Sequence, residues 1–324
     1  MNTRQLSYFL SIAEHGSLSG ASLALGVSQP ALSKYLSQLE AELGTELFLR
    51  HNKKLYLTAA GRTYLDAANR IISVKEQTYQ MIASLSGGYQ KTITVGVTPL
   101  RGAIAIAKIF PQFHKRYPNV NIEMKEQYSS DLRQSVINHS VNLALGTCID
   151  LEDPEILRIS CHEENLVLFV PSFHPLASLA SKDPDHLTPI EIERFADTPF
   201  LLGRPGSTIR QLADIIFQQG NVQPTVVYEA NNNLILKNMA QNGAGIAILA
   251  KAHMEPCSSL VYFQLKPAYS VHLVIMAPRD RELSEEERYL MALNFEMESS
   301  NPDYHFNPSP MAREILEEFR HPHP

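Results

Sequence analysis

Residues 17–39 read SLSGASLALGVSQPALSKYLSQL and carry the clearest structural pattern in the N-terminal part of the chain. Apolar residues recur in it at steps of three and four, which is the spacing of one face of a helix. Gly26 interrupts the pattern at a place suited to left-handed backbone, and Ser28 followed by Pro30 is typical of a helix start. Ser17 provides the same kind of start for the preceding helix. The stretch therefore predicts a helix, a tight turn and a second helix.

The flanking residues complete a small domain. Residues 5–15 place apolar side chains at helical spacing, and Gly16 ends that segment. Two short apolar segments at 47–49 and 55–57 flank a basic tip, which is typical of a hairpin wing. The non-apolar face of the third helix offers short or flexible polar groups that can reach base edges and phosphates. A helix face turned toward water has the same composition, so this pattern alone leaves both interpretations open.

The distribution of charge favours nucleic acid as the partner of this domain. Residues 1–62 hold six basic and four acidic side chains, whereas the whole chain of 324 residues holds 28 and 34 and has a net charge of −6. A mildly basic head on an acidic body is what a DNA-binding module joined to a solvated body would show. The candidate DNA contacts are Ser17, Ser28, Gln29, Pro30, Ser33, Lys34, Ser37, Gln38, Arg50, Lys53 and Lys54.

The same residues resemble a known family. The N-terminal domain of LysR-type transcriptional regulators has, in the same order and spacing, segments that match SLSGASLA at 17–24, VSQPALS at 27–33, LE at 39–40, LG at 43–44, LF at 47–48, Arg50 and LTAAG at 57–61. The resemblance implies a winged helix-turn-helix that binds double-stranded promoter or operator DNA, in a homodimer or homotetramer that contacts RNA polymerase if it activates. Lys34 stands where the family often has Arg, which replaces a bidentate fork with a point charge.

Residues 59–88 form the next predicted element. Apolar side chains recur at steps of three and four from Tyr64 to Leu85, and Gly87 and Gly88 end the pattern. A coiled-coil seam and a single buried amphipathic helix both fit it, because fewer than four clean heptads are present. The family resemblance implies a linker helix that pairs two subunits.

From residue 91 the chain alternates strands with helices, which favours an α/β domain with a parallel sheet. Strands are predicted at 92–97, 120–124, 143–146, 166–170, 200–202, 225–228, 246–249 and 271–276. Helices are predicted at 104–113, 132–137, 232–241 and 285–297, and a further helix is expected to begin at Thr188-Pro189.

The family resemblance extends over this region through motifs such as HPL at 174–176 and GAGI at 243–246. It implies an effector-binding domain similar to periplasmic solute-binding proteins. The expected fold class is thus an α+β multidomain chain, with an N-terminal winged helix-turn-helix, a long linker helix and a C-terminal two-lobed α/β domain. The expected boundaries are 1–58, 59–88 and 89–298 for these parts, with lobe I at 91–165 and 268–298, lobe II at 166–267, and a C-terminal extension at 299–324.

A small ligand is expected between the two lobes, where strand ends and helix N-termini present free N–H groups. Arg101 and Arg204 lie near two such helix starts and suit a carboxylate or another anion. Each of the residues concerned would serve equally well in an ordinary helix cap or turn. The candidate effector contacts are Thr98, Pro99, Leu100, Arg101, Ser129, Thr147, Gly203, Arg204, Ser207, Thr208, Asn231, Asn233 and Gly245.

No catalytic motif is present in the sequence: it contains no P-loop, no nucleophile elbow and no His pair at metal spacing. HEE at 162–164 and HPH at 321–323 are expected to be solvated surface and tail rather than metal ligands. Cys148 is expected to be a buried thiol, with a redox sensor as the alternative. The sequence thus predicts a protein that is not an enzyme and needs no cofactor.

The remaining expectations concern location, the C-terminus and a rival function. No apolar run approaches the roughly 18–20 residues that span a bilayer, and the N-terminus shows no export signal, so the cytoplasm is expected. A helix starting at Ser309-Pro310, with Met311, Ile315, Leu316 and Phe319 on one side, either docks onto the body or lies in a disordered tail. A small-molecule binding or transport module with a helical head for protein contacts is the alternative function.

Overall fold

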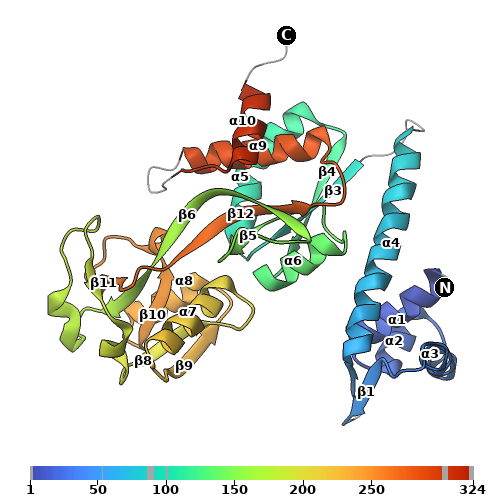
Figure 1. The fold of residues 1–324 in the computed structure, drawn as a ribbon, viewed down its shortest axis with the longest axis horizontal. Helices are drawn as coiled ribbons and strands as arrows, with labels where there is room; N and C mark the ends of the chain where they lie inside the picture. Colours follow the sequence, from blue (N-terminus) through green and yellow to red (C-terminus); the bar gives the residue numbers. More distant parts are fainter. Residues whose placement is uncertain (1–2, 53, 86–90, 100, 301–305, 321–324) are drawn as a thin grey trace. The chain divides into compact units, whose positions relative to one another are not determined.

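The computed structural model describes residues 3–52, 54–85, 91–99, 101–300 and 306–320 (Figure 1). The chain forms two compact units, one of residues 1–91 with 137–140, and the other of residues 92–136 with 141–324. Among the described residues, no helix combines the length and the apolar character needed to cross a membrane.

The first unit is a three-helix domain with a hairpin wing and a long helix. Ser17 caps the second helix by accepting a hydrogen bond from the Gly20 N–H, and Gly26 ends it with a left-handed φ of 65°. Ser28 stands at the N-cap of the third helix, but its side chain makes no capping hydrogen bond with a described residue, contrary to the cap expected there. The elements are α1 (Thr3–His15), α2 (Leu18–Leu25), α3 (Gln29–Leu43), β1 (Phe48–His51), β2 (Lys54–Leu57) and α4 (Ala59–Leu85).

Close packing joins the wing to α3 and α4. The Glu40 carboxylate on α3 accepts hydrogen bonds from the backbone N–H groups of Leu47 and Phe48, at 2.8 and 3.2 Å. In α4, a Cβ at Gly61 would lie 2.0 Å from the carbonyl oxygen of Leu47, so only glycine allows this approach. The wing is therefore held in a fixed position on the helical domain.

The second unit is built on a ten-stranded sheet with the strand order β4-β3-β5-β12-β6-β10-β8-β9. Outside this order, β11 pairs with β6, and β7 pairs with β11. Pairs within each half are parallel, such as β3 with β5 and β8 with β9, whereas β6 and β12 are antiparallel to their neighbours. The strands are β3 (Lys91–Val97), β4 (Val120–Glu126), β5 (Leu143–Cys148), β6 (Ile156–Pro171), β7 (Thr188–Ile190), β8 (Pro199–Gly203), β9 (Thr225–Ala230), β10 (Ile246–Ala250), β11 (Leu260–Leu265) and β12 (Ser270–Pro278).

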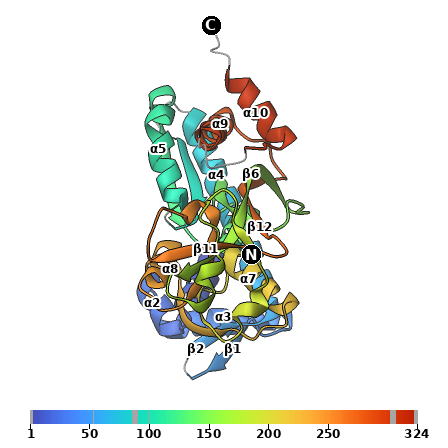
Figure 2. The same ribbon diagram turned by 90° about the vertical axis from the view of Figure 1, so that its left-hand side faces the viewer.

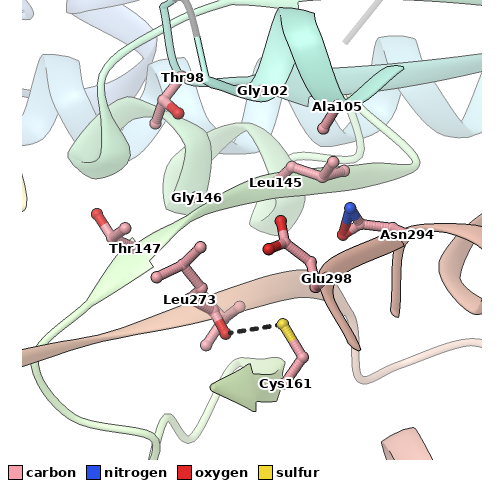
Figure 3. A pocket seen from close by; sticks show the side chains of 11 residues that line it. Thr98, Gly102, Ala105, Leu145, Gly146, Thr147, Cys161, Leu273, Asn294 and Glu298 are labelled. Atoms are coloured by element: carbon pink, nitrogen blue, oxygen red, sulfur yellow. Dashed lines mark hydrogen bonds between the residues drawn. The ribbon is translucent and has the colours of Figure 1, made fainter. Parts of the chain in front are cut away.

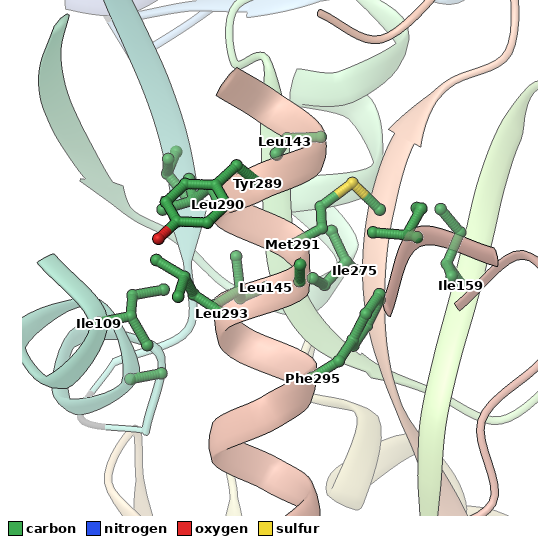
Figure 4. Close-up of a cluster of buried hydrophobic side chains, with 14 of the residues drawn as sticks. Ile109, Leu143, Leu145, Ile159, Ile275, Tyr289, Leu290, Met291, Leu293 and Phe295 are labelled. Atoms are coloured by element: carbon green, nitrogen blue, oxygen red, sulfur yellow. The ribbon is translucent and has the colours of Figure 1, made fainter. Parts of the chain in front are cut away.

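Helices cover this sheet in both lobes. The α-helices are α5 (Arg101–Arg116), α6 (Ser129–Ile137), α7 (Thr208–Gln219), α8 (Asn233–Gln241), α9 (Glu285–Ser299) and α10 (Pro310–Arg320), and the short 3-10 turns are η1 (Pro175–Leu179), η2 (Ile192–Phe195) and η3 (Lys251–His253). In lobe I, α9 lies on the sheet with Leu290, Leu293 and Phe295 against the strands (Figure 4).

The long strand β6 connects the two lobes. Its residues 156–165 pair with β12 in lobe I, and its residues 166–171 pair with β10 and β11 in lobe II. Each lobe has its own buried apolar clusters, one around Phe113 and Phe295 and another around Phe195 and Phe200. The two-lobed α/β architecture expected from the sequence is therefore present.

Three local expectations were wrong or incomplete. Thr188-Pro189 begins no helix, because residues 188–190 form the edge strand β7, which pairs in parallel with β11. An edge strand tolerates proline because one side of its backbone needs no partner. The lobe I half of β6 and the whole of β11 were not predicted, since their polar and apolar residues do not alternate cleanly.

The C-terminal extension docks onto lobe I, where α10 packs on α9 (Figure 2). Ala312, Ile315 and Leu316 are buried, and the Phe319 ring lies edge-on to Tyr289 with centres 5.2 Å apart. Of the two outcomes expected for this helix, docking onto the body and a disordered tail, the structure confirms docking. Met311, expected on the same apolar side, is 38% exposed.

Candidate DNA interface and effector site

The third helix separates its apolar and polar residues on opposite sides. It buries Leu32, Tyr35, Leu36 and Leu39 against the domain core. The side chains of Gln29, Pro30, Lys34, Ser37 and Gln38 are exposed, and that of Ser33 is half-buried. Six candidate DNA contacts thus share the solvent-facing side of one helix, which is the arrangement that a major groove accepts.

The remaining DNA candidates surround this helix. Arg50 and Lys54 are exposed on the two strands of the wing, and Lys53 lies outside the described residues. Ser28 is exposed at the start of α3, whereas the hydroxyl of Ser17 is occupied in capping α2. Ser17 therefore has a structural role in capping α2, and its O–H can still donate.

The exposed position of the large apolar residue Leu23 in this unit was not predicted from the sequence. Leu23 on α2 is 84% exposed, although it is a large apolar residue. Its position between the inward-facing residues Ala21 and Leu25 is the signal that could have found it, because a helix residue off the apolar face points outward.

In the second unit, the structure brings together several candidate effector residues from both lobes. The Ser129 and Thr147 hydroxyl oxygens lie 3.5 Å apart in lobe I. From lobe II, the Thr208 hydroxyl donates a 2.9 Å hydrogen bond to the carbonyl of Thr147. Thr98 lies beside them, because its N–H donates to the carbonyl of Leu145 one strand away. This is the place where the lobes meet.

Arg204 supplies an exposed cation in lobe II just before α7. It forms no ion pair with another described residue, and its backbone N–H donates to the carbonyl of Ala230. Ser207 caps α7 by accepting from the Arg210 N–H, and a Cβ at Gly203 would lie 2.7 Å from the Ser207 oxygen.

Of the other effector candidates, Asn231 and Asn233 have described side chains that make no hydrogen bond with a described residue of this cluster. Pro99 is half-buried, Leu100 lies outside the described residues, and Arg101 is described only as the first residue of α5. Asn231 is exposed and Asn233 hydrogen-bonds the His253 ring at 3.3 Å.

Gly245 is also explained by packing. A Cβ at this position would lie 2.6 Å from the carbonyl oxygen of Pro199. The glycine therefore permits close packing within lobe II, and no contact of this residue points to the cluster where the lobes meet.

A cavity of about 30 Å³ lies inside lobe I next to these strand ends (Figure 3). Thr98 and Thr147 line it, together with Asn294 and Glu298 on α9. Sequence reasoning missed the two α9 residues, because nothing in a helix pattern near the end of a domain marks a residue as pocket-lining.

Burial determines the state of the thiols. Burial raises the pKa of Cys148 to about 11, so the residue stays protonated at neutral pH. This favours the inert thiol over the redox sensor. Cys257 differs, because a hydrogen bond with Ser259 lowers its pKa.

The expectation for residues 162–164 was wrong in part. His162 and Glu164 are 1% and 4% exposed, so they are core residues of β6 rather than solvated surface. Within the part of the chain that the structure describes, no three His, Cys, Asp or Glu side chains are grouped as a metal site would need. His321 and His323 lie outside the described residues.

Fold and geometry together define a class: a winged helix-turn-helix joined to a two-lobed α/β ligand domain. A family model described as bacterial regulatory helix-turn-helix protein, lysR family, matches residues 3–62, and the LysR substrate binding domain matches residues 86–293. The chain therefore belongs to the LysR family and is a DNA-binding transcriptional regulator with a substrate-binding domain.

Individual relatives are similar over most of their length. A probable RuBisCO transcriptional regulator of Porphyra purpurea is 30% identical over 251 residues, covering 76% of this chain and 77% of that protein. The uncharacterized HTH-type transcriptional regulator YybE of Bacillus subtilis is 28% identical over 249 residues, covering 77% and 82%. A full-length variant of OxyR from Pseudomonas aeruginosa shares the fold with a TM-score of 0.56, at 19% identity over 96% and 98% of the chains.

Proposed function

We propose that this regulator recognises an operator through α3 and the wing, and that a small anion bound between the lobes changes this recognition. The observation that supports the anion is Arg204, an exposed cation without an ion pair among the described residues, beside the loop that bonds across to Thr147. An anion there would gain charge-assisted hydrogen bonds from the guanidinium and the nearby hydroxyl groups.

The DNA part of the proposal rests on the exposed side of α3. Gln29 and Ser33 would read base edges, while Arg50, Lys53 and Lys54 of the wing would contact phosphates. Closure of the lobes by the ligand would act as a population shift between two arrangements of the subunits. The chain would work in the cytoplasm as a homodimer or homotetramer, by binding rather than catalysis, and would contact RNA polymerase where it activates.

The first test measures binding of the full chain to DNA flanking its own coding region and to random DNA, over a salt series. The proposal predicts tighter binding to the flanking DNA and a log-linear loss of affinity with salt on both. Weak binding that is equal on both DNAs and at all tested promoters would contradict it and would favour a transport module.

The second test adds a panel of small carboxylates to the same assay. At least one carboxylate should shift the affinity of the wild-type chain for its operator, and Arg204→Ala should abolish that shift without abolishing DNA binding. A shift that survives in Arg204→Ala would contradict the placement of the anion.

A further inference from the structure

The cavity in lobe I has polar groups at both ends and apolar walls between them. Its walls come from the first turn of α5, from β5 and from β12, through Gly102, Leu145 and Leu273. Figure 3 shows Asn294 and Glu298 on one side of it and Thr98 and Thr147 on the other. The cavity therefore runs from the strand ends at the place where the lobes meet to two side chains of α9.

Asn294 is the unusual member of this set. Its side chain is buried, with 4% of the residue exposed, and its Nδ2 has no hydrogen-bond partner among the described residues. Buried amide groups in folded proteins are almost always hydrogen-bonded, so an unpaired donor that lines a cavity points to an occupant. Glu298 follows four residues later on the same face of α9, and its carboxylate is also largely buried.

The C-terminal extension holds in place the part of β6 at Cys161 that lines the cavity. The pairing of β12 with β6 shifts register between Leu273 and Val274, which leaves Cys161 as the extra residue of a β-bulge. The carbonyl of Cys161 accepts a 3.0 Å hydrogen bond from the N–H of Asn307 in the extension. The extension thus holds the strand segment that lines the cavity.

We propose that this cavity is a second binding pocket, which takes a small neutral group carrying both a donor and an acceptor, such as a primary amide or a hydroxyl. The acceptor of the ligand would pair with Nδ2 of Asn294, and its donor would pair with the carboxylate of Glu298. A carboxylate ligand is disfavoured, because the cavity already holds the Glu298 carboxyl group, 3.9 Å from Nδ1 of His162, and none of the described lining residues is Lys or Arg.

The size of the cavity sets the size of the group. A cavity of about 30 Å³ holds roughly two water-sized groups, so it admits a head group whose apolar stem lies against Leu145 and Leu273. The pocket adjoins the anion site proposed between the lobes, because Thr98 and Thr147 line the pocket and also belong to the cluster there. Asn294 and Glu298 belong to the pocket alone.

The test uses two probes of the same shape, propionamide and propionate, and ligand-observed saturation-transfer NMR on the full chain. Propionamide should show saturable binding to the wild-type chain, and propionate should not compete with it. Asn294→Leu should weaken propionamide binding at least tenfold, because it removes the donor and fills the cavity. Asn238→Leu, the same substitution at an exposed position of α8, should leave the binding unchanged.

Thermal unfolding shows whether each variant is folded. Asn294→Leu should unfold at the wild-type temperature or above it, since it replaces an unpaired buried donor with an apolar side chain. Ala105→Val narrows the cavity from α5 and should produce the same loss of binding. Propionamide binding that is absent or does not saturate in the wild type would overturn the proposal. So would binding to folded Asn294→Leu and Ala105→Val that is as strong as binding to the wild type.

Discussion

The two compact units place their polar residues in opposite ways. In the winged-helix unit, the polar residues of α3 face solvent and the apolar ones are buried. In the effector unit, His162, Asn294 and Glu298 are 1%, 4% and 8% exposed, in the interior of lobe I. The first unit therefore presents polar side chains on the surface of one helix, whereas the second encloses polar side chains inside lobe I.

The largest effect is expected where the extension joins the interior of lobe I. Leu316→Ala should lower the free energy of unfolding of the effector unit by about 3 kcal/mol, because it leaves a cavity under α10. Urea unfolding of the full chain measures this, with Met311→Ala on the exposed side of α10 as the control, at roughly 0.5 kcal/mol or less. Equal effects of the two would show that α10 is not part of the lobe I core.

A second expected effect concerns Asp153, whose carboxylate bonds Arg133 and Arg158 at 2.7 and 2.8 Å. Burial opposes its ionisation, but the hydrogen bonds and charges of these arginines hold its pKa below the ordinary value. Asp153→Asn should cost about 2 kcal/mol at neutral pH.

This contribution depends on pH in a defined direction. Because the folded pKa is lowered, the stabilisation is complete above the unfolded value of about 4 and is lost as pH falls through the folded pKa. The difference in stability between wild type and Asp153→Asn should therefore stay constant from pH 7 down to about pH 5 and shrink as the pH falls below about 4. Asp214→Asn, at an exposed ion pair with Arg210, is the control and should change the free energy of unfolding by roughly 0.5 kcal/mol or less. A cost as large as that of Asp153→Asn would contradict the greater contribution assigned to the buried carboxylate of Asp153.

A smaller effect is expected at the contact between the lobes. Thr208→Val keeps the side-chain shape but removes the hydrogen bond to the carbonyl of Thr147, which should cost about 1 kcal/mol. Thr188→Val removes a bond of the same 2.9 Å length to Leu179 at an exposed site, where water replaces it. Thermal unfolding should rank Thr208→Val as the more destabilised, and the reverse order would contradict a dry contact between the lobes.

The sequence predicted the two units unequally well, and the comparison explains why. On α3 the helical period alone separates buried from exposed residues, so the polar face could be predicted residue by residue. The polar residues at 162–164 suggested a segment exposed to solvent. In the structure this part of β6 lies next to the bulge at Cys161 and to the docked extension.

Long-range contacts account for the rest. Thr147 and Thr208 are distant in the chain, and only their position at strand and helix ends suggested that they meet. Asn294 and Glu298 gave no signal, because their importance depends on a cavity formed by α5, β5, β6 and β12. Local patterns therefore predict surfaces that one element presents, and they miss pockets that several elements enclose.

The most direct test of the central claim compares Gln29→Ala on α3 with Lys54→Ala on the wing, each titrated onto operator and random DNA over a salt series. Because both side chains are exposed, neither change should alter stability. Gln29→Ala should weaken operator binding about tenfold and leave random DNA almost unaffected, while Lys54→Ala should weaken both and reduce the salt slope by about 1. Equal losses on both DNAs for Gln29→Ala would contradict sequence recognition by the surface of α3.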